Sequence, residues 1–425
     1  MEDPTTFIFQ IREDVKWQPS IETTEQNVTA YDVEFSLNRQ KQESSDNSHI
    51  IHMIKSIKAE SNERVKLELI HPDADLFVAL ANGKTKIISK DVNSHFTDLS
   101  QGPVIGSGSW RTNYSLGDET VVLNKWKLQR KTPYVDSLRI MHIPDSQARK
   151  SAFMVNLIDV YQVELKDLEQ FSETQYLSHP DPGVGLELAF NTRTHPFNEI
   201  VLRKAVMFAI DPDDIIAQGW NSKAFFSLGY PVTSQNWLIN PDKLKKYFNV
   251  PDNANTIMKE LKVDGVNITI TSSDFGEEYM KSLEIITSQL QFVGFNTTLI
   301  MMDRRQYSVE AWKKGNYQIL VGPILPQNSL NGYLLSMMHS TGPWNTTHNE
   351  DIKLDQLIET QASEYDHQTR KNIIQTIETH ILEKAYRFMP ATRTSVWSWQ
   401  ENVANFFPNF SGNEYSHWDH VWVKP

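Results

Sequence analysis

The feature that most restricts the fold of this chain is a strand–helix–strand pattern at residues 266–302. Val266–Ile270 alternates β-branched and polar residues as a half-buried strand does. The apolar residues that follow recur at helical spacing: Leu283, Ile286, Leu290 and Val293. Gly294 is suited to end that helix, and Thr297–Met302 predicts a second strand. Because two strands joined by one crossover helix lie parallel, the pattern predicts an α/β domain.

Other segments carry equally local signals. Strands are predicted at Phe7–Ile11, Val65–Leu69, Glu119–Leu123 and Leu138–Ile143. Thr29 begins a predicted helix as its N-cap, with Asp32 three residues on in a variant of the capping box. Asn198 can cap a helix that runs to Ala209, and Asp211-Pro212 is a typical start for the next helix.

Length and composition restrict the class of protein. At 425 residues the chain exceeds one compact core, and domains of about 100–200 residues predict two or three. The formal net charge of −12 disfavours binding to nucleic acid, whose phosphates require a basic face. The sequence has no cysteine, which excludes disulfides, thiolate zinc sites and cysteine nucleophiles. Aromatic residues make up 11% of the chain, and such a share suits a pocket that buries an organic ligand.

The sequence shows no signal for membrane insertion or export. No apolar run approaches the ~18–20 residues that span a bilayer. Met1–Asp14 lacks the basic region followed by an apolar region that marks a signal peptide. We therefore expect that the protein is not exported or that the start of its gene is missing.

Motifs for catalysis are sparse. The sequence has no G-x-S-x-G, no phosphate loop and no H-E-x-x-H, and Gly106-Ser107-Gly108 is interpreted as a turn at a domain crossing. His417 and His420 have ligand-like spacing, but no further ligand stands near them, which favours an aromatic chain end over a metal site. We expect no catalytic residue, no metal and no cofactor. A hydrolase acting on peptide or glycoside is the alternative, because paired catalytic carboxylates can be distant in sequence.

Five segments, in order along the chain, resemble the peptide/nickel-type solute-binding proteins (solute-binding protein family 5). Phe7–Trp17 resembles the family's F-x-L-R-x-D/G-V-K-W/F strand, and Val28–Val33 resembles its V/L-T-A-x-D-V helix start. Val104–Trp110 stands where the family has G-T/N-G-P/A-Y. The most specific match is Asn191–Asp211, against N-x-x-x-x-P-F-x-D-x-x-V-R-x-A-x-x-x-A-I-D. Trp344-Asn345 with the later Leu354–Ile358 resembles the family's W-N and L-D-x-L-I ending.

The resemblance implies a fold and a domain organisation. The expected fold class is α/β, a periplasmic-binding-protein-like two-lobed fold with a hinge (type II, cluster C like) and a smaller third domain. The expected division is a small additional domain at 1–106, a large lobe at 107–210 completed by 395–425, and a second α/β lobe at 211–394. By the same resemblance, the chain lacks the family's N-terminal signal and a first strand.

One segment departs from the family pattern. Many peptide-binding relatives carry G-W-x-x-D-Y, in which the Asp meets the amino terminus of the peptide. The matching stretch is Gly322–Asn328, with Pro323 in place of the Trp and Pro326 in place of the Asp. Burying the ammonium group of a peptide without a carboxylate partner is costly. The resemblance therefore supports the family of the chain better than it supports a peptide as the ligand.

Nine residues are candidates for contact with a ligand by their position in this resemblance: Trp110, Asn191, Phe225, Tyr230, Gln327, Asn328, Trp344, Asn345 and Trp397. Trp110 and Trp397 suit core packing equally well, and Asn191 suits a turn cap. Phe225 and Tyr230 favour a binding role, because they lie in a loop beside glycine and proline.

The resemblance implies a substrate-binding component of a bacterial ABC importer. Such a protein captures a peptide or other small organic solute in a cleft between its lobes and delivers it to membrane permease subunits. The expected chain is a monomer without enzymatic activity or a nucleic-acid partner, in the periplasm or at the cell surface as a lipoprotein. A chemoreceptor partner or chaperone-like protein on the same scaffold is a third hypothesis.

Overall fold

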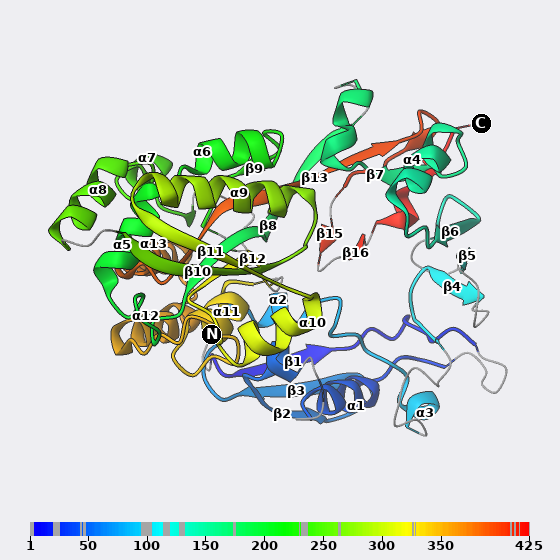
Figure 1. Cartoon of the computed structure of the whole chain (residues 1–425). Helices are drawn as coiled ribbons and strands as arrows, with labels where there is room; N and C mark the ends of the chain where they lie inside the picture. The colour runs from blue at the N-terminus through cyan, green and yellow to red at the C-terminus, as the bar shows by residue number, and fades with distance from the viewer. Residues whose placement is uncertain are drawn as a thin grey trace. The chain divides into compact units, whose positions relative to one another are not determined.

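The computed structural model describes residues 4–19, 26–42, 45, 48–94, 104–113, 120–126, 132–172, 176–228, 230, 237–261, 265–324, 327, 329–408, 410–411, 414–415 and 417–424. The chain forms two compact units (Figure 1): unit 1 is Met1–Leu177 with Val396–Pro425, and unit 2 is Ser178–Ser395. The boundary expected at 106/107 lies within unit 1, and the one expected at 210/211 lies within unit 2. The finer three-part division stays a prediction.

A small antiparallel sheet opens unit 1. Its strand order is β1 (Thr6–Gln10), β3 (Arg64–Leu69) and β2 (Ile54–Ala59), and α1 (Ala30–Gln40) packs on β2 and β3. The capping box predicted at Thr29 is present, because Asp32 accepts hydrogen bonds from the backbone N and the hydroxyl of Thr29. The predicted strand at Phe7–Ile11 and the predicted helix start at Thr29 are both confirmed.

The remainder of unit 1 consists of short elements. Its helices are α2 (Leu76–Leu80), α3 (Lys90–Asn93) and α4 (Ser146–Met154), with 3-10 turns at Ser48–Ile51, Leu165–Gln170 and Trp418–His420. A second antiparallel sheet has the order β4 (Trp110–Asn113), β5 (Thr120–Lys125), β6 (Ser137–Met141). The other strands are β7 (Val160–Gln162), β14 (Val403–Ala404), β15 (Phe410–Ser411), β16 (Glu414–Tyr415) and β17 (Trp422–Val423). Phe406 packs among Trp399, Tyr415 and Trp418 in an aromatic core near the chain end.

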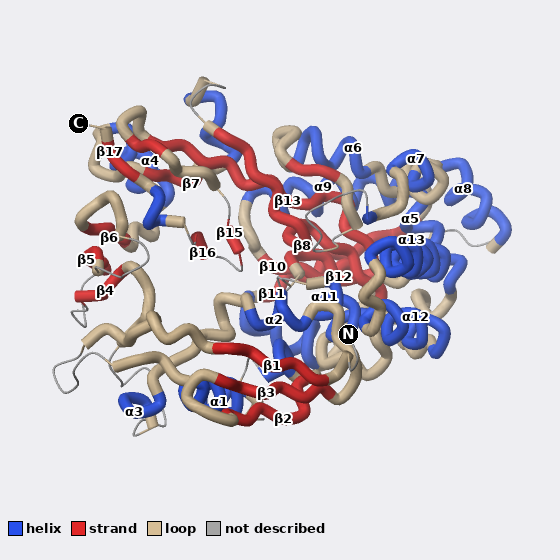
Figure 2. The backbone as a smooth tube through the Cα atoms, turned by 180° about the vertical axis from the view of Figure 1, so that it is seen from behind, coloured by secondary structure: helices blue, strands red, loops and turns tan. Residues whose placement is uncertain are grey.

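A mixed sheet forms the centre of unit 2 (Figure 2). Its strands follow the order β11 (Phe295–Met302), β10 (Val266–Ser273), β12 (Ile319–Pro323), β8 (Leu177–Phe190), β13 (Arg387–Trp399), and β9 (Ala224–Phe225) pairs with β13. β10 is parallel to β11 and to β12, whereas β8 is antiparallel to β12. The last residues of β13, beyond the unit boundary, pair with β7.

Helices pack around this sheet. They are α5 (Ile200–Ala209), α6 (Pro212–Asp214), α7 (Pro241–Leu244), α8 (Pro251–Glu260), α9 (Glu277–Phe292), α10 (Arg304–Gln306), α11 (Leu330–Tyr333), α12 (Ile352–Ala362) and α13 (His367–Lys384). π-helical turns lie at Ile215–Gly219, Tyr307–Lys313 and Leu334–Met338. In the part of the chain that the structure describes, no helix combines the length and the hydrophobicity needed to cross a bilayer.

The strand–helix–strand prediction is confirmed in unit 2. β10 and β11 pair in parallel from Val266 opposite Phe295 to Ser273 opposite Met302, and α9 between them packs on β11. Asp211 caps α6 as predicted, by accepting hydrogen bonds from the backbone N atoms of Asp213 and Asp214. The cap of α5 differs from the prediction, because the helix begins after Glu199 rather than Asn198.

Candidate functional site

The candidate site of unit 2 lies where its parallel strands end. β10 ends at Ser273, β11 at Met302 and β12 at Pro323, so the segments after β10 and β11 emerge at the same edge of the sheet as the last residue of β12. Ligands of open α/β sheets bind outside the carboxyl ends of the strands. This edge is therefore the first place to look for binding groups.

Two aromatic rings lie directly against the end of β12. A Cβ atom on Gly322 would lie 2.5 Å from the hydroxyl oxygen of Tyr307 and 3.0 Å from Cε2 of Phe275, so only glycine permits this close approach. The two rings meet edge to face, with centroids 4.9 Å apart. The hydroxyl of Tyr307 donates a hydrogen bond to the carbonyl of Val321 at 3.4 Å.

Two tryptophans continue this aromatic surface. The side chain of Trp312, on the π-helical turn after α10, packs against the buried cluster that contains Tyr307. The ring of Trp344 lies 6.3 Å from that of Trp312, and both side chains are half-buried. Arg304 places its guanidinium 5.6 Å from the centroid of Phe275 and is held by a hydrogen bond from its Nε to the carbonyl of Asp274. We call Phe275, Arg304, Tyr307, Trp312 and Trp344 the strand-end surface.

Tyrosine hydroxyls near this surface keep their protons. Burial raises the pKa values of Tyr307 and Tyr317 well above the ordinary value of 10.0. Burial also raises the pKa of Tyr279 to about 12, and the ring of Tyr279 meets that of Phe275 edge to face. These hydroxyls are therefore neutral donors and acceptors at physiological pH, and they suit hydrogen bonding rather than proton abstraction.

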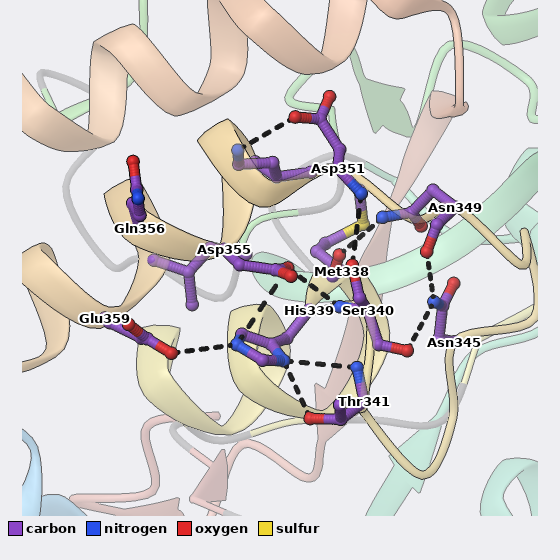
Figure 3. A network of polar contacts seen from close by, with 12 residues as sticks. Met338, His339, Ser340, Thr341, Asn345, Asn349, Asp351, Asp355, Gln356 and Glu359 are labelled. Atoms are coloured by element: carbon purple, nitrogen blue, oxygen red, sulfur yellow. Dashed lines mark hydrogen bonds and ion pairs between the residues drawn. The ribbon is translucent and has the colours of Figure 1, made fainter.

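The loop that carries Trp344 is organised by polar contacts (Figure 3). We call residues 338–351 the Trp344 loop. The side-chain amide of Asn349 donates to the carbonyl of Met338 at 2.9 Å, and that of Asn345 donates to the carbonyls of Ser340 and Asn349. The backbone N of Asp351 donates to the hydroxyl of Ser340 at 3.1 Å. The two ends of the loop are thus bonded to each other.

Helix α12 supports the start of this loop (Figure 3). Asp355 accepts a hydrogen bond from the backbone N of Ser340 at 2.8 Å. Nδ1 of His339 accepts from the backbone N and the hydroxyl of Thr341, so the ring proton is on Nε2, which faces Glu359 at 3.3 Å. His339 therefore joins the loop to the exposed side of α12.

Asp351 holds the end of the loop. Its Oδ2 lies 2.7 Å from Nε2 of His380 and accepts a hydrogen bond from the hydroxyl of Tyr386 at 2.9 Å. Burial alone would raise the pKa of Asp351, but the hydrogen bonds from His380, the backbone N of Leu354 and Tyr386 outweigh it, and the pKa is lowered from 3.8.

An ion pair lies buried beneath the loop. Nε of Arg387 is 2.6 Å from Oε1 of Glu187, and the two residues are 2% and 4% exposed. The same guanidinium donates to the hydroxyl of Thr346 at 3.0 Å and to the carbonyl of Met337 at 3.3 Å. Burial raises the pKa of Glu187, and the charge of Arg387 opposes that rise. The pair fixes the middle of the Trp344 loop against β8 and β13.

The structure assigns different positions to the candidate residues in unit 2. Trp344 belongs to the strand-end surface, and Asn345 holds the loop that carries it. Asn191 is 3% exposed and its side-chain amide donates to the carbonyls of Gly315 and Tyr317, so it pins a turn. Phe225 is half-buried in β9 opposite Thr392, and Tyr230 is 2% exposed with its ring 5.2 Å from that of Tyr333.

The other candidates lie elsewhere. Gln327 is half-buried near Gly332, whereas Asn328 and Pro326 lie outside the described residues. Trp110 in β4 and Trp397 in β13 both belong to unit 1, where the carbonyl of Trp110 accepts a hydrogen bond from Gln18 and Trp397 packs on the aromatic core near the chain end. The ligand-contact roles of all nine candidates stay predictions.

Sequence reasoning missed Phe275, Arg304, Tyr307 and Trp312. A usable signal existed, because the predicted strand–helix–strand unit already places the residues after its two strands at a ligand-binding edge. In the part of the chain that the structure describes, no cluster of three His, Asp or Glu side chains is arranged to hold a metal ion. The ring of His417 lies 5.7 Å from that of His420, beside Tyr415 and Trp418.

Comparisons with known proteins agree with this architecture. Residues 1–346 match the family described as "Bacterial extracellular solute-binding proteins, family 5 Middle". A dipeptide-binding protein of Escherichia coli is 23% identical over 356 residues, which are 75% of this chain and 64% of that protein. Heme-binding protein A of Haemophilus influenzae is 24% identical over 291 residues, 61% of this chain and 51% of that protein. The chain thus spans less than two thirds of these curated relatives.

A solved structure shows the fold. The periplasmic binding protein DppA of Helicobacter pylori, in complex with the peptide STSA, superposes with a TM-score of 0.81 at 19% identity, covering 100% of this chain and 88% of that one. The expected fold class, a two-lobed periplasmic-binding-protein-like α/β fold of the cluster C type, is confirmed. The chain belongs to the bacterial extracellular solute-binding proteins, family 5.

Proposed function

We propose that this chain is the substrate-binding component of a bacterial ABC importer, which captures a peptide or another small organic solute and delivers it to membrane permease subunits. Its place of action is then outside the cytoplasmic membrane, in the periplasm or at the cell surface as a lipoprotein, and it acts as a monomer. The single observation that carries the proposal is the strand-end surface, where the half-buried rings of Trp312 and Trp344 meet and the Arg304 guanidinium lies over the Phe275 ring.

The chemistry of this surface suits binding. Aromatic faces bury apolar parts of a solute over a large area at little cost in side-chain entropy, and a guanidinium pairs with carboxylates. The nearby tyrosine hydroxyls keep their protons, so none of them serves as a base. Pro323 ends β12 and offers no N–H donor. We therefore expect a solute at this strand end to be held mainly by the burial of its apolar surface. We infer that the chain is a binding protein rather than an enzyme.

A thermal-shift screen tests the proposal. Dipeptides, longer peptides, sugars and haem are added to the intact chain, and a bound solute raises the melting temperature with a dependence of RT ln(1 + [L]/Kd) on its concentration. The matched variants are Trp344→Ala, on the strand-end surface, and Trp237→Ala, which replaces a half-buried tryptophan of unit 2 whose ring meets that of His367 edge to face. Trp344→Ala is expected to weaken binding at least ten-fold while Trp237→Ala leaves it within two-fold, as for a lost hot-spot aromatic.

The outcomes separate the hypotheses. A solute recovered chemically unchanged after saturation supports a binding protein. Cleaved peptide or glycoside in the same samples would overturn it in favour of a hydrolase. Capture of a membrane partner with no stabilising solute would favour the chemoreceptor-partner or chaperone-like hypothesis. Equal weakening by the two tryptophan variants would remove the strand-end surface from the proposed site.

A further inference from the structure

Two strands connect unit 2 to unit 1. The chain enters unit 2 at Ser178 in β8 and leaves it after Ser395 in β13. β8 and β13 are neighbours in the central sheet (Figure 2). Any change in the orientation of one unit relative to the other must therefore bend or twist these two segments.

The backbone hydrogen bonds of β13 change from one unit to the other at Ser395. The backbone N of Thr394 donates to the carbonyl of Lys223 at 3.2 Å, within unit 2. The carbonyl of Val396 accepts from the backbone N of Val163 at 2.8 Å, within unit 1. Ser395 therefore separates a bond that belongs to unit 2 from a bond that belongs to unit 1.

β8 departs from regular strand geometry close to its entry into unit 2. Gly183 has a φ of 75°, in the left-handed region that glycine adopts more readily than other residues. Hinges are short segments whose φ and ψ angles change while the flanking parts stay rigid. The segment from Ser178 to Gly183 has the position and the backbone conformation for such a change.

One carboxylate ties the two connecting segments together. Oδ2 of Asp181, in β8, accepts a hydrogen bond from Nε of Arg393 at 2.9 Å and another from the hydroxyl of Ser395. Nδ1 of His179 lies 3.7 Å from the other carboxylate oxygen. The Asp181 side chain is only 15% exposed, and a charge-assisted hydrogen bond is about twice as strong as a neutral one. Asp181 thus bonds the entering strand to the residue at which the leaving strand changes units.

We propose that Asp181, Arg393 and Ser395 form a clamp that restricts the motion of unit 2 relative to unit 1. While the clamp is intact, β8 and β13 bend together. Once it is broken, each strand bends by itself and the two units sample a wider range of orientations. Because the clamp acts on the motion of the chain, the proposal does not depend on whether a solute binds at the strand-end surface.

A distance measurement between two spin labels tests the clamp. The chain has no cysteine, so Asn38→Cys in α1 and Thr376→Cys in α13, both at exposed positions, place one label on each unit. Double electron–electron resonance then measures the distribution of distances between the labels. Asp181→Asn removes the charge and keeps the size of the side chain, and we expect it to widen this distribution about two-fold relative to the labelled parent chain.

Asp351→Asn is the matched control. Asp351 is also a carboxylate of unit 2, with its side chain 11% exposed, and it is bonded to the side chains of His380 and Tyr386, but it lies on neither β8 nor β13. The same substitution there should lower stability and leave the distance distribution unchanged. Equal widening by Asp181→Asn and Asp351→Asn would attribute the effect to a general loosening of unit 2 and would overturn the proposal.

Ser395→Ala keeps the test independent of the fold of Asp181→Asn. It removes one donor of the clamp and leaves the ion pair between Asp181 and Arg393 in place. The expected distribution is wider than that of the labelled parent chain and narrower than that of Asp181→Asn. A distribution as narrow as that of the parent chain, in either folded variant, would overturn the proposal.

Discussion

Glu378 is a buried carboxyl group whose replacement by glutamine should stabilise unit 2 in a pH-dependent way. The side chain lies on α13 with no exposed surface, and its Oε2 accepts a hydrogen bond from the backbone N of Ile239 at 2.8 Å. Its Oε1 has no hydrogen-bond partner among the described residues. Burial raises the pKa of Glu378 from 4.5 to about 8.

The sign of the effect follows from proton binding. The folded chain keeps the Glu378 proton up to about pH 8, whereas the unfolded chain loses it near 4.5, so the folded state binds more protons between these values. Stability therefore falls as pH rises through this window and is unaffected by Glu378 below it. One pKa unit corresponds to about 1.36 kcal/mol, so the loss between pH 5 and pH 7 is about 2.7 kcal/mol.

Glu378→Gln removes this titration and keeps the packing. The amide oxygen still accepts from Ile239, and the amide N–H₂ presents a donor where the protonated acid presents its O–H. We expect the stability of Glu378→Gln relative to the parent chain to grow by about 1.4 kcal/mol per pH unit between pH 5 and pH 7.5. Hydrogen exchange of α13 amides, corrected for the pH dependence of intrinsic exchange, measures the free energy of opening of this region.

Glu383→Gln is the matched control on the same helix. Glu383 is partly exposed, and its pKa is lowered, first by the hydrogen bond from Tyr247, so its contribution is lost only as pH falls below the ordinary value of 4.5. The stability of Glu383→Gln relative to the parent chain should therefore not change between pH 5 and pH 7.5. A flat profile for Glu378→Gln as well would refute the reasoning, because it would mean that the folded chain accommodates the ionised Glu378.

Three further predictions concern the strand-end surface and the loop beside it. Arg387→Met should destabilise the chain by about 3–5 kcal/mol, because it leaves Glu187 buried without its cation, and adding Glu187→Gln should restore part of the loss in urea unfolding. Gly322→Ala should cost about 1–3 kcal/mol, because its Cβ would meet Tyr307, whereas Gly108→Ala, with no atom within 4 Å of its Cβ, should be nearly neutral in the same assay. Asp351→Asn should lower thermal stability at neutral pH by about 1–3 kcal/mol, because it weakens the bonds to His380 and Tyr386. The pKa of Asp351 is lowered from 3.8, so this difference should persist above pH 3.8 and disappear as pH falls through the lower folded value. Persistence at lower pH would show that the effect does not depend on the ionised carboxylate of Asp351.

Local signals predicted the local elements. The capping box at Thr29, the Asp211-Pro212 helix start and the β10–α9–β11 unit each depend on residues within a few positions of one another. β8 could not be found in this way, because Pro180, Pro182 and two glycines interrupt its sequence. A Cβ on Gly185 would lie 2.1 Å from the carbonyl of Ala391, so that glycine serves the close pairing of β8 with β13. The requirement comes from a strand about 200 residues away.

The same limit applies to the candidate site. The resemblance led to Trp344 and Asn345, which lie on one loop. It also led to Asn191, whose polar groups the fold uses to satisfy the carbonyls of Gly315 and Tyr317. Glu187 and Arg387 were beyond prediction, because their side chains meet only after β8 and β13 pair. A sequence pattern identifies which polar residues are present. Tertiary pairing decides which of their polar groups are already bonded within the protein and are therefore not available to a ligand.

If the strand-end surface binds solute as proposed, the polar contacts of the Trp344 loop give its buried residues an indirect part in that binding. Asn349 and Asn345 close the loop on itself, Thr346 is held by Arg387, and Asp351 is held by His380. All of these contacts are made within the chain, so we expect the cost of about 0.5–1.5 kcal/mol for immobilising each side chain of a binding surface to be met during folding. Asn349→Ala should therefore weaken solute binding although Asn349 is buried and Trp344 is unchanged. The same affinity in Asn349→Ala as in the parent chain would show that the loop is ordered by the solute instead.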